Sequence, residues 1–419
     1  MEALGVRRSG PLARSPRSSA GDAGRARIEW AARQMPVVRS LRDRLASERP
    51  LDGRLVCACL HVTAETAVLA QALGAGGAEV ALCAANPFST QDDVVAALAD
   101  AGMDVLAARG ESAADYASHI AQLAARSPAV ALDDGADLIA AVHDDDALLG
   151  ATEETTTGLV RLRAMVADGT LRCPVLAVNE ALSERTFNDR FGTGQSTLDG
   201  ILRATNVLLA GRTVVVLGYG ATGRGVAQRA RGAGASVIVC EVDPMAALEA
   251  RMEGFDVMPA LRAAERGDVF VTVTGVRGAL RLEHFERMKD GAILANAGHF
   301  DVEISLDDLG PGREVRPLVA EHDVGDRRLY LLAGGRVVNL AAAEGHPAAV
   351  MDVSFALHVL AVEELVRSAG SLAPGVHPVP GALDREVAAL KLATLDVEID
   401  TLTAEQEAYL RPWEGRADA

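Results

Sequence analysis

The chain is poor in aromatic residues and in positive charge. Aromatic side chains make up 3% of the 419 residues, and 58 acidic against 41 basic side chains leave a formal net charge of −17. Because such a charge repels the phosphates of nucleic acids, we expect no nucleic-acid partner. No apolar run reaches the roughly 18 residues that a membrane-spanning helix needs, so we also expect no membrane partner.

Cysteine is scarce, and its placement argues against metal binding. The chain has five cysteines, an odd number without the paired spacing of zinc ligands, so we expect no metal site. Most of them lie in apolar runs, where thiols behave as small hydrophobic side chains, and this favours a reducing, cytoplasmic setting. Residues 1–27 carry many Arg, Gly, Ser and Pro residues, and we expect them to form a disordered tail.

What the chain does contain is an alternation of short apolar runs with helical patterns. It begins at Ile28, and a second cycle of the same kind begins at Arg212. This rhythm is typical of parallel sheets with helices on both faces, so we predict an α/β fold with two doubly wound, Rossmann-like domains. The loop-rich segment 179–200 is the predicted hinge. The expected parts are a first domain at 28–183 completed by 346–380, a second at 184–345, and a C-terminal helical segment at 381–419.

A glycine fingerprint indicates a dinucleotide in the second domain. Gly218, Gly220 and Gly223 directly follow the apolar run 213–217. Between a strand and a helix, this spacing leaves backbone N–H groups free to bind a pyrophosphate. Glu241 ends the next apolar run, near the spacing of about 20 residues expected for a carboxylate that binds a ribose diol. Since a carboxylate repels a 2′-phosphate, we predict NAD rather than NADP.

Polar residues also follow apolar runs of the first domain, where an open α/β sheet binds its ligands. His61 is a candidate general acid or base, because its pKa lies near neutrality. Thr63 and Glu65 could hydrogen-bond a purine, although Thr63 taken alone is better explained as a helix cap. Asp133 and Asp134 fit a turn, a metal site or an acid–base pair about equally.

A run of threonines is harder to explain by structure alone. Glu154 is followed by Thr155, Thr156 and Thr157, which are unfavourable in a helix and offer three hydroxyls to a ligand.

Several segments together resemble one enzyme family. Residues 60–69 (LHVTAETAVL), 88–92 (FSTQD), 153–158 (EETTTG) and 298–304 (GHFDVEI) occur in this order. They resemble adenosylhomocysteinase, the NAD-dependent S-adenosylhomocysteine hydrolase family, and the likeness extends from about residue 28 to about residue 415. The loop 190–196, the helix 350–355 and the ending 409–415 resemble the short, archaeal-type branch, which lacks the Lys/Tyr tail of other members.

The resemblance implies a homotetramer of two-domain subunits that bind NAD and an adenine nucleoside. In the implied cycle the ribose 3′-hydroxyl is oxidised, the C4′ proton and the 5′ substituent leave, and reduction regenerates the cofactor. Implied substrate-binding residues are Thr63, Glu65, His346, Met351 and Phe355. Implied catalytic residues are His61 and Asp134, which handle protons at C4′ and C5′, with Glu154 and His299 beside the sugar and leaving group. Implied NAD-binding residues, beside the glycines and Glu241, are Thr155, Thr156, Thr157, Asn296 and Asn339.

One segment departs from the family. Members have a lysine followed four and five residues later by Asp and Asn, whereas this chain has Glu184, Asn188 and Asp189. A cation and an anion are thereby replaced by two anions, which shifts the pKa of neighbouring groups. We expect Glu184 to act as base for the sugar hydroxyl, or Arg185 to take the place of the lysine, or the substrate to differ.

Three functions are compatible with this departure. The first is a dehydratase that oxidises an adenine nucleoside, eliminates water and reduces the ketone; dehydratases on this fold act in nucleoside-antibiotic pathways such as that of angustmycin. The second is a true S-adenosylhomocysteine hydrolase with a rearranged site. The third is a catalytically silent regulatory paralogue that binds NAD or adenosine, against which the intact acid–base motifs argue. We rank the dehydratase first.

Overall fold

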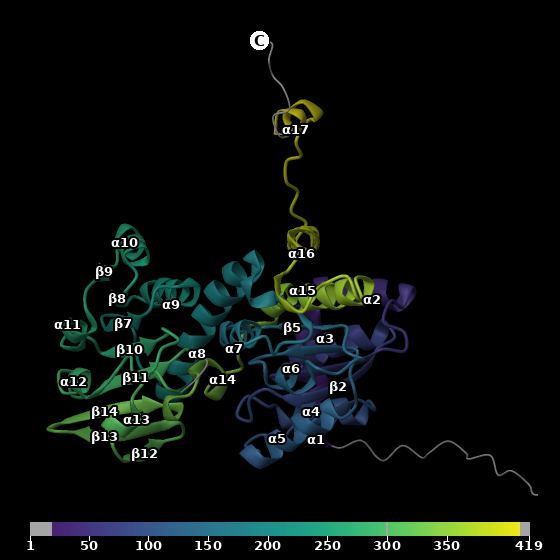
Figure 1. Cartoon of the computed structure of the whole chain (residues 1–419). Coiled ribbons are helices and arrows are strands. Elements are labelled where there is room, and N and C mark those ends of the chain that lie inside the picture. Colours follow the sequence, from purple (N-terminus) through teal and green to yellow (C-terminus); the bar gives the residue numbers. More distant parts are fainter. Residues whose placement is uncertain (1–18, 299–300, 411–419) are drawn as a thin grey trace, which may run out of the picture.

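The computed structural model describes residues 19–298 and 301–410, which form two α/β domains side by side (Figure 1). The first domain holds a sheet of seven parallel strands in the order β15-β6-β5-β4-β1-β2-β3. They are β1 (Leu55–Leu60), β2 (Glu79–Ala84), β3 (Asp104–Leu106), β4 (Val130–Asp133), β5 (Gly150–Glu153), β6 (Pro174–Ala177) and β15 (Gly375–Pro378). Its helices are α1 (Ser19–Arg33), α2 (Pro36–Glu48), α3 (Ala64–Ala75), α4 (Asp92–Asp100), α5 (Ala113–Ala124), α6 (Asp137–Val142), α7 (Thr156–Ala167) and α15 (Ala348–Arg367).

Both faces of this sheet are covered, as the side chains of β1 show. Val56, Ala58 and Leu60 pack in a core with residues of α2, α3 and α15, whereas Cys57 and Cys59 pack in a second core with residues of α5, α6 and α7. Because successive side chains of a strand point to opposite faces, a strand covered on both sides is apolar throughout. All five cysteines are buried and free.

The second domain is built around eight strands in the order β12-β13-β14-β11-β10-β7-β8-β9. They are β7 (Thr213–Leu217), β8 (Ser236–Cys240), β9 (Asp256–Val257), β10 (Val269–Thr272), β11 (Ala292–Asn296), β12 (Gly312–Arg316), β13 (Val319–Val324) and β14 (Arg327–Leu332). Its helices are α8 (Gly194–Thr205), α9 (Ala221–Gly232), α10 (Pro244–Met252), α11 (Ala260–Ala264), α12 (Leu282–Phe285), α13 (Leu306–Leu309) and α14 (Val338–Ala341). The pairs β12–β13 and β13–β14 are antiparallel and the others parallel, so the predicted fold class is confirmed with an antiparallel edge added.

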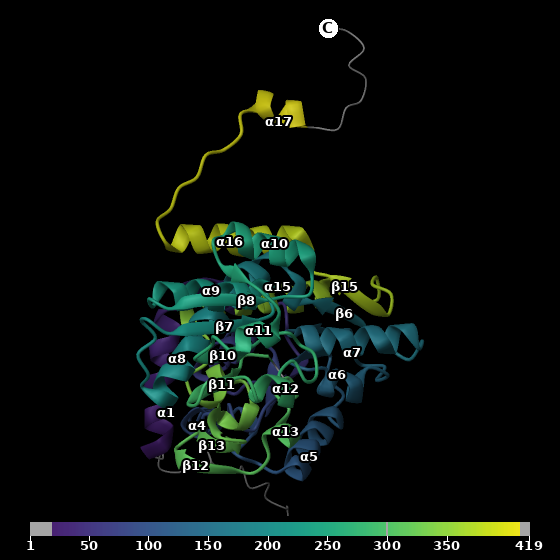
Figure 2. The same cartoon turned by 90° about the vertical axis from the view of Figure 1, so that its left-hand side faces the viewer.

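The chain returns to the first domain after residue 346. Helix α15 packs against α2 and α3, and β15 pairs with β6 at the edge of the first sheet. Helix α16 (Gly381–Thr394) lies on α15 and α2, and α17 (Ala404–Leu410) extends away from both domains (Figures 1 and 2). Of the predicted C-terminal helical segment, residues 395–403 between these helices are not helical, and residues 411–419 lie outside the described part.

The prediction of a disordered tail over residues 1–27 was wrong for residues 19–27, which belong to α1. Gly21 and Gly24 are buried in this helix, which packs against α4. A Cβ at Gly24 would overlap the backbone carbonyl of Asp93. Glycines that suggested disorder in the sequence therefore allow one helix to lie close to another.

The prediction of a loop-rich hinge at 179–200 was also wrong in its secondary structure. The segment contains a short 3₁₀ turn η1 (Val178–Glu180), a π-helix η2 (Glu184–Thr193) and the start of α8; a second 3₁₀ turn, η3 (Ala333–Gly335), follows β14. Gly194 lies against the backbone of Gly225 in α9, where a Cβ would not fit. In the part of the chain that the structure describes, no helix is long and apolar enough to cross a membrane.

Candidate active site

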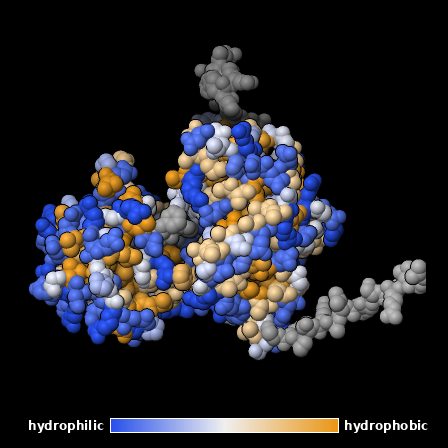
Figure 3. Space-filling model, turned by 60° about the horizontal axis from the view of Figure 1, so that its bottom comes forward, coloured by the Kyte–Doolittle hydropathy of each residue, from blue (hydrophilic) through white to orange (hydrophobic). Residues whose placement is uncertain are grey.

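Polar side chains from three neighbouring strands gather at the carboxyl edge of the first sheet. His61, Asp134 and Glu154 directly follow the ends of β1, β4 and β5. Because β4 pairs with both β1 and β5, these residues lie on adjacent strands. Figure 3 shows a cleft between the two lobes of the molecule. The sequence prediction that these three residues meet at one sheet edge therefore agrees with the topology.

The imidazole of His61 is held at both nitrogens. Its Nδ1 lies 2.6 Å from Ser89 Oγ, and its Nε2 lies 3.2 Å from Asp134 Oδ2. Ser89 Oγ donates its own hydrogen to the carbonyl of Asn86 at 2.8 Å, so it accepts from Nδ1–H. A hydrogen bond at Nε2 then requires one further proton, on either the imidazole or the carboxyl group. His61 and Asp134 together form a pair that can hold and release a proton.

Two buried carboxyls behind this edge order the backbone. Asp133 accepts from two backbone N–H groups, one of them that of Asp134 at 2.9 Å, and burial raises the pKa of Asp133 to about 7. Glu153 accepts from the backbone N–H of Thr155 at 2.9 Å and from its hydroxyl at 2.6 Å. Of the predicted Asp133–Asp134 pair, only Asp134 contacts His61, whereas Asp133 fixes the loop.

Glu154 joins β5, η2 and α15 through three contacts. Its Oε1 accepts from Ser354 Oγ at 2.9 Å and from Asn188 Nδ2 at 3.0 Å, and its Oε2 lies 2.6 Å from His358 Nε2. Burial, followed by the negative charge of Asp134, raises the pKa of Glu154 to about 8. The carboxyl group therefore holds a proton at neutral pH.

The segment that departs from the family enters the same network. Glu184 Oε2 lies 2.7 Å from Asn188 Nδ2, so one amide group bridges the carboxyls of Glu184 and Glu154. Burial raises the pKa of Glu184 well above its usual range, and it raises the pKa of the neighbouring Asp189 to about 6. Among the described residues, neither Glu184 Oε1 nor Asn188 Oδ1 has a hydrogen-bond partner. Buried polar atoms left open in this way are suited to a bound substrate.

Arg185 does not take the place of the family lysine. Its side chain is 57% exposed and lies 3.7 Å from the carboxylate of Glu180. The expectation that Arg185 enters the site was therefore wrong, because the π-helix turns Glu184 and Asn188 inward and leaves Arg185 at the surface.

The predicted adenine-binding residues lie around the start of α3 and the start of α15. Thr63 Oγ1 accepts from the N–H of Thr66 at 3.5 Å, which is the helix cap considered from the sequence. Burial raises the pKa of Glu65. His346 Nε2 lies 3.0 Å from Thr193 Oγ1, and burial lowers the pKa of His346 to about 4, so this imidazole is neutral.

The other two predicted substrate residues follow along α15. Met351 is half-buried against the first core. Phe355 is buried in that core, with its ring 6.2 Å from the ring of His358. Phe355 therefore supports the packing of the site, and its contact with substrate stays a prediction.

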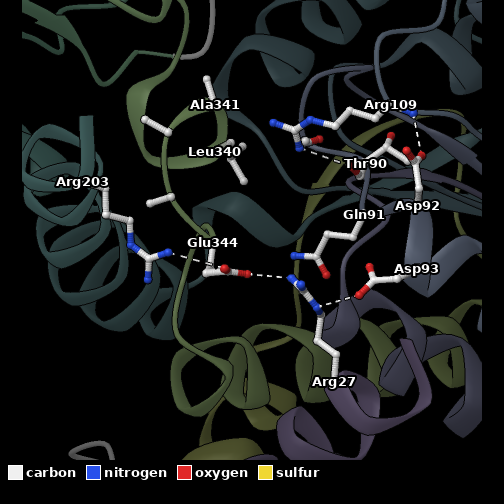
Figure 4. A pocket seen from close by; sticks show the side chains of 13 residues that line it. Arg27, Thr90, Gln91, Asp92, Asp93, Arg109, Arg203, Leu340, Ala341 and Glu344 are labelled. Carbon is white, nitrogen blue, oxygen red and sulfur yellow. Dashed lines mark hydrogen bonds and ion pairs between the residues drawn. The ribbon is translucent and has the colours of Figure 1, made fainter. Parts of the chain in front are cut away.

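A pocket of about 360 Å³ opens between the domains next to Ser89 (Figure 4). Glu344 spans it: one carboxylate oxygen lies 2.8 Å from Arg27 of α1, and the other lies 3.4 Å from Arg203 of α8. Arg27 also pairs with Asp93 at 3.1 Å. We call the Arg27–Glu344–Arg203 contacts the Glu344 bridge, because they link a helix of the first domain to one of the second.

The glycine fingerprint forms the turn from β7 into α9, as predicted. Gly218 has a φ of 101°, and a Cβ at Gly223 would overlap the carbonyl of Gly218. A Cβ at Gly220 would meet no atom within 4 Å, so there is open space beside the N-terminus of α9. Glu241 accepts from the backbone N–H of Tyr219 at 2.6 Å, which fixes its carboxylate next to this turn. These residues fit a dinucleotide, with the pyrophosphate at the helix N-terminus and a ribose at Glu241.

The remaining predicted NAD-binding residues have structural contacts of their own. Thr155 caps α7, because its hydroxyl accepts from the N–H of Gly158 at 3.1 Å. The hydroxyl of Thr156, the first residue of α7, donates to Asn179 at 2.8 Å, and Thr157 follows it in the helix. The role of the three threonines in cofactor binding stays a prediction.

Two predicted asparagines lie in the second domain, Asn296 as the last residue of β11 and Asn339 within α14. Asn296 Oδ1 accepts from Thr272 Oγ1 at 3.0 Å, whereas Asn339 Nδ2 donates to Ser196 Oγ at 3.2 Å. Both side chains are buried at the side of the domain that faces the fingerprint turn. His299, expected beside the leaving group, lies outside the described residues.

Sequence reasoning missed Ser354 and His358. Both contact Glu154, and they lie four residues apart on α15, which places them on one face of the helix. A histidine within an otherwise apolar helix, spaced by four from a serine, was the available signal.

Comparison with known proteins supports the resemblance. The S-adenosyl-L-homocysteine hydrolase family matches residues 17–148, and its NAD-binding domain matches residues 189–345. The chain is 53% identical to adenosylhomocysteinase of Gloeobacter violaceus, with 93% of this chain and 94% of the relative covered. It is 54% identical to adenosylhomocysteinase of Aquifex aeolicus, with 94% and 97% covered.

A further relative and one solved structure complete the comparison. The chain is 52% identical to S-inosyl-L-homocysteine hydrolase of Methanopyrus kandleri, with 93% of this chain and 95% of the relative covered. A dipicolinate synthase component from Bacillus halodurans shares the fold, with a TM-score of 0.51 at 13% identity over 76% of this chain and 99% of that one. Together with the glycine turn, which is suited to a dinucleotide, these findings show that the chain belongs to the NAD-dependent S-adenosyl-L-homocysteine hydrolase family.

Proposed function

We propose that the chain is an NAD-dependent adenine-nucleoside dehydratase, which removes water across C4′ and C5′ of the sugar. The observation that carries the proposal is Glu184, a buried carboxyl group with a raised pKa where the resembling family has lysine. Around it, Glu154 and Asp189 also have a raised pKa, of about 8 and about 6. Hydroxide is a poor leaving group and must receive a proton as it departs, so a site that stores protons suits this elimination.

Glu184 and the His61–Asp134 pair have separate roles in this reaction. When bound, NAD supplies the reversible oxidation of the ribose 3′-hydroxyl. The resemblance assigns position 184 to the neighbourhood of the 3′-oxygen, where a neutral Glu184 donates a hydrogen bond as negative charge develops on that oxygen. The hydrogen-bonded pair of His61 and Asp134 removes the C4′ proton and protonates the departing 5′-oxygen. The C5′–O bond breaks, and water leaves.

Hydrolysis of S-adenosylhomocysteine is the second candidate. It is favoured by the names of the relatives, which are 52–54% identical to this chain. Those names also differ in the nucleobase, adenosyl in one and inosyl in another. Identity at this level therefore leaves room for a change of substrate, and the charge at position 184 is the feature that favours the dehydratase.

Product analysis separates the two. The NAD-loaded protein is incubated with adenine nucleosides that carry a free 5′-hydroxyl and, separately, with S-adenosylhomocysteine, and the products are followed by mass. We expect a nucleoside to lose the mass of water, and His61→Ala to abolish this loss. Rapid release of homocysteine without dehydration would refute the dehydratase, and absence of reaction with either substrate would favour a silent, regulatory paralogue.

Substitution at position 184 provides the matched control. Glu184→Gln keeps the size and the contact with Asn188 but removes the acid, and we expect it to slow dehydration by roughly a hundredfold to ten-thousandfold. Glu184→Lys combined with Asn188→Asp and Asp189→Asn restores the residues of the resembling family. We expect this triple variant to gain hydrolase activity. By the same resemblance we expect a homotetramer, which sedimentation equilibrium tests.

A further inference from the structure

A buried histidine that no part of the proposed reaction uses lies directly behind the catalytic carboxyls. His358 is 0% exposed, and its Nδ1 lies 2.9 Å from Thr152 Oγ1 while its Nε2 lies 2.6 Å from Glu154 Oε2. Burial lowers the pKa of His358 to about 4, so the imidazole is neutral and carries one ring proton. When the Thr152 hydroxyl donates to Nδ1, that proton resides on Nε2 and points at Glu154.

The two carboxyls of the network receive unequal numbers of hydrogen bonds. Glu154 lies within hydrogen-bond distance of three donor groups, from Asn188, Ser354 and His358. The shortest contact of Glu184 is with the same amide of Asn188 at 2.7 Å. Hydrogen bonds to a carboxylate favour its charged form, so the carboxyl with more donors ionises first. Glu184 Oε1, buried and without a hydrogen-bond partner among residues 19–298 and 301–410, is free to carry a proton.

We propose that His358 is a positioning residue that fixes the order in which the two carboxyls release their protons. Glu154 becomes the anion, and Glu184 keeps its proton and donates a hydrogen bond to a substrate oxygen. The active form of the pair thus holds one proton, which resides on Glu184. The inference rests on the proposed function only for the identity of that oxygen. Which of the two carboxyls carries the proton is already decided in the protein without substrate.

The surroundings of Glu154 are compatible with this order. Burial and the charges of Asp134 and Asp189 raise its pKa, whereas the hydrogen bonds from Ser354 and Asn188 lower it, with the result near 8. The anion of Glu154 is therefore accessible at mildly alkaline pH.

The surroundings of Glu184 hold its proton more strongly. Burial and then the charge of Glu154 raise its pKa well above its usual range, although Asn188, Ser354 and His358 act in the opposite direction. Once Glu154 is ionised, its charge opposes ionisation of Glu184. Arg185, which is exposed, acts on Asp189. No buried cation among the described residues competes with His358 for Glu154.

Infrared titration of the carboxyl C=O bands tests the inference without any turnover. The NAD-loaded protein is labelled with isotopic glutamate and titrated without substrate. Beside the band of Glu153, whose pKa is also raised by burial, we expect a band of Glu154 that titrates near pH 8 and a band of Glu184 that persists to higher pH. We call these the first and the second band. Glu184→Gln should remove the second band, and Glu154→Gln should remove the first. Loss of the Glu184 proton before that of Glu154 would overturn the proposal.

Variants of His358 show whether it sets the order. His358→Leu removes the donor to Glu154 Oε2, and the first titration should move up by about one to two pH units. The acid limb of the pH profile for nucleoside turnover should move with it. His358→Gln keeps an N–H donor and should restore most of the original titration. Thr152→Val removes only the hydroxyl that fixes the tautomer of His358. This variant should fold, and its titration of Glu154 should shift less than that of His358→Leu.

Two outcomes separate this inference from the proposed function. If the titrations follow the expected order but no nucleoside loses water, the dehydratase is refuted, whereas the inference that Glu154 ionises before Glu184 is supported. If water is lost but His358→Leu leaves both the titration and the acid limb unchanged, His358 has only a packing role and the inference is refuted.

Discussion

Two alanine substitutions in the glycine fingerprint are expected to have different effects, one on the stability of the fold and the other on cofactor binding. At Gly223 a new Cβ would overlap the carbonyl oxygen of Gly218, which is backbone and cannot rotate away. At Gly220 a new Cβ would meet no protein atom within 4 Å. Gly223→Ala therefore tests the packing of α9 on the turn, and Gly220→Ala tests whether the open space beside the turn receives the pyrophosphate.

The magnitudes follow from these contacts. Overpacking of this kind costs about 1–3 kcal/mol, because α9 must move away from the turn. For a domain of about 150 residues, each kcal/mol lowers the melting temperature by about 2–4 °C, so Gly223→Ala should melt several degrees lower. Gly220→Ala should melt as the parent does in the absence of NAD. Its methyl group should weaken NAD binding at least about tenfold, which corresponds to about 1.4 kcal/mol.

Calorimetric unfolding of NAD-free protein and titration with NAD measure the two effects separately. The reasoning about the turn would be refuted by a Gly220→Ala variant that binds NAD as tightly as the parent, since the space beside Gly220 would then not be the phosphate site. A Gly223→Ala variant with unchanged melting temperature would refute the close packing of α9.

Three further perturbations test other parts of the structure. Glu344→Gln removes the negative charge of the Glu344 bridge, whose exposed ion pairs contribute about 0.2–1 kcal/mol each. Small-angle scattering should therefore show a modest opening of the cleft in the variant. The parent protein should show the same opening at high salt, which screens these ion pairs. Gly24→Ala should destabilise the chain by about 1–3 kcal/mol in urea unfolding, because the new methyl group would overlap the Asp93 carbonyl. Burial raises the pKa of Glu154 to about 8, so the protonated carboxyl contributes stability that is fully present below the ordinary pKa of glutamate and is lost as pH rises towards 8. Urea unfolding at pH 5.5 and at pH 8 should show a lower free energy of unfolding at pH 8. Glu154→Gln should reduce this difference.

The parts of the fold that sequence predicted are those with strong hydrophobic patterns. Strands such as β1 and β7 are apolar throughout because both faces of their sheets are covered, and that pattern identified two parallel-sheet domains. The fingerprint turn was predictable because two requirements for glycine lie within the turn itself: Gly218 has a φ of 101°, and a Cβ at Gly223 would overlap the carbonyl of Gly218. Local sequence is sufficient where the constraint is local.

The parts that sequence did not predict depend on distant contacts. Helix α1 contains Gly24, where a side chain would overlap the backbone of Asp93 in α4. The polar residues of η2 are buried where α15 and α9 lie beside it. His358 could be read from the sequence as one more residue of an apolar helix. Its contact with Glu154 depends on the packing of α15 over the end of β5, 204 residues away in the chain.

The position of η2 allows the residue at 184 to be exchanged while the cofactor turn stays intact. One side of η2 carries Glu184 into the network with Glu154, and the other side packs on α9, the helix that begins at the fingerprint. Contact with α9 is tight, since a Cβ at Gly225 would overlap the carbonyl of Arg190 in η2. A change of charge on the inner side of η2 changes the hydrogen-bond network of Glu154, whereas the outer side still packs on α9. The residue type at 184 can therefore vary while the packing of η2 on α9 and the dinucleotide turn are retained.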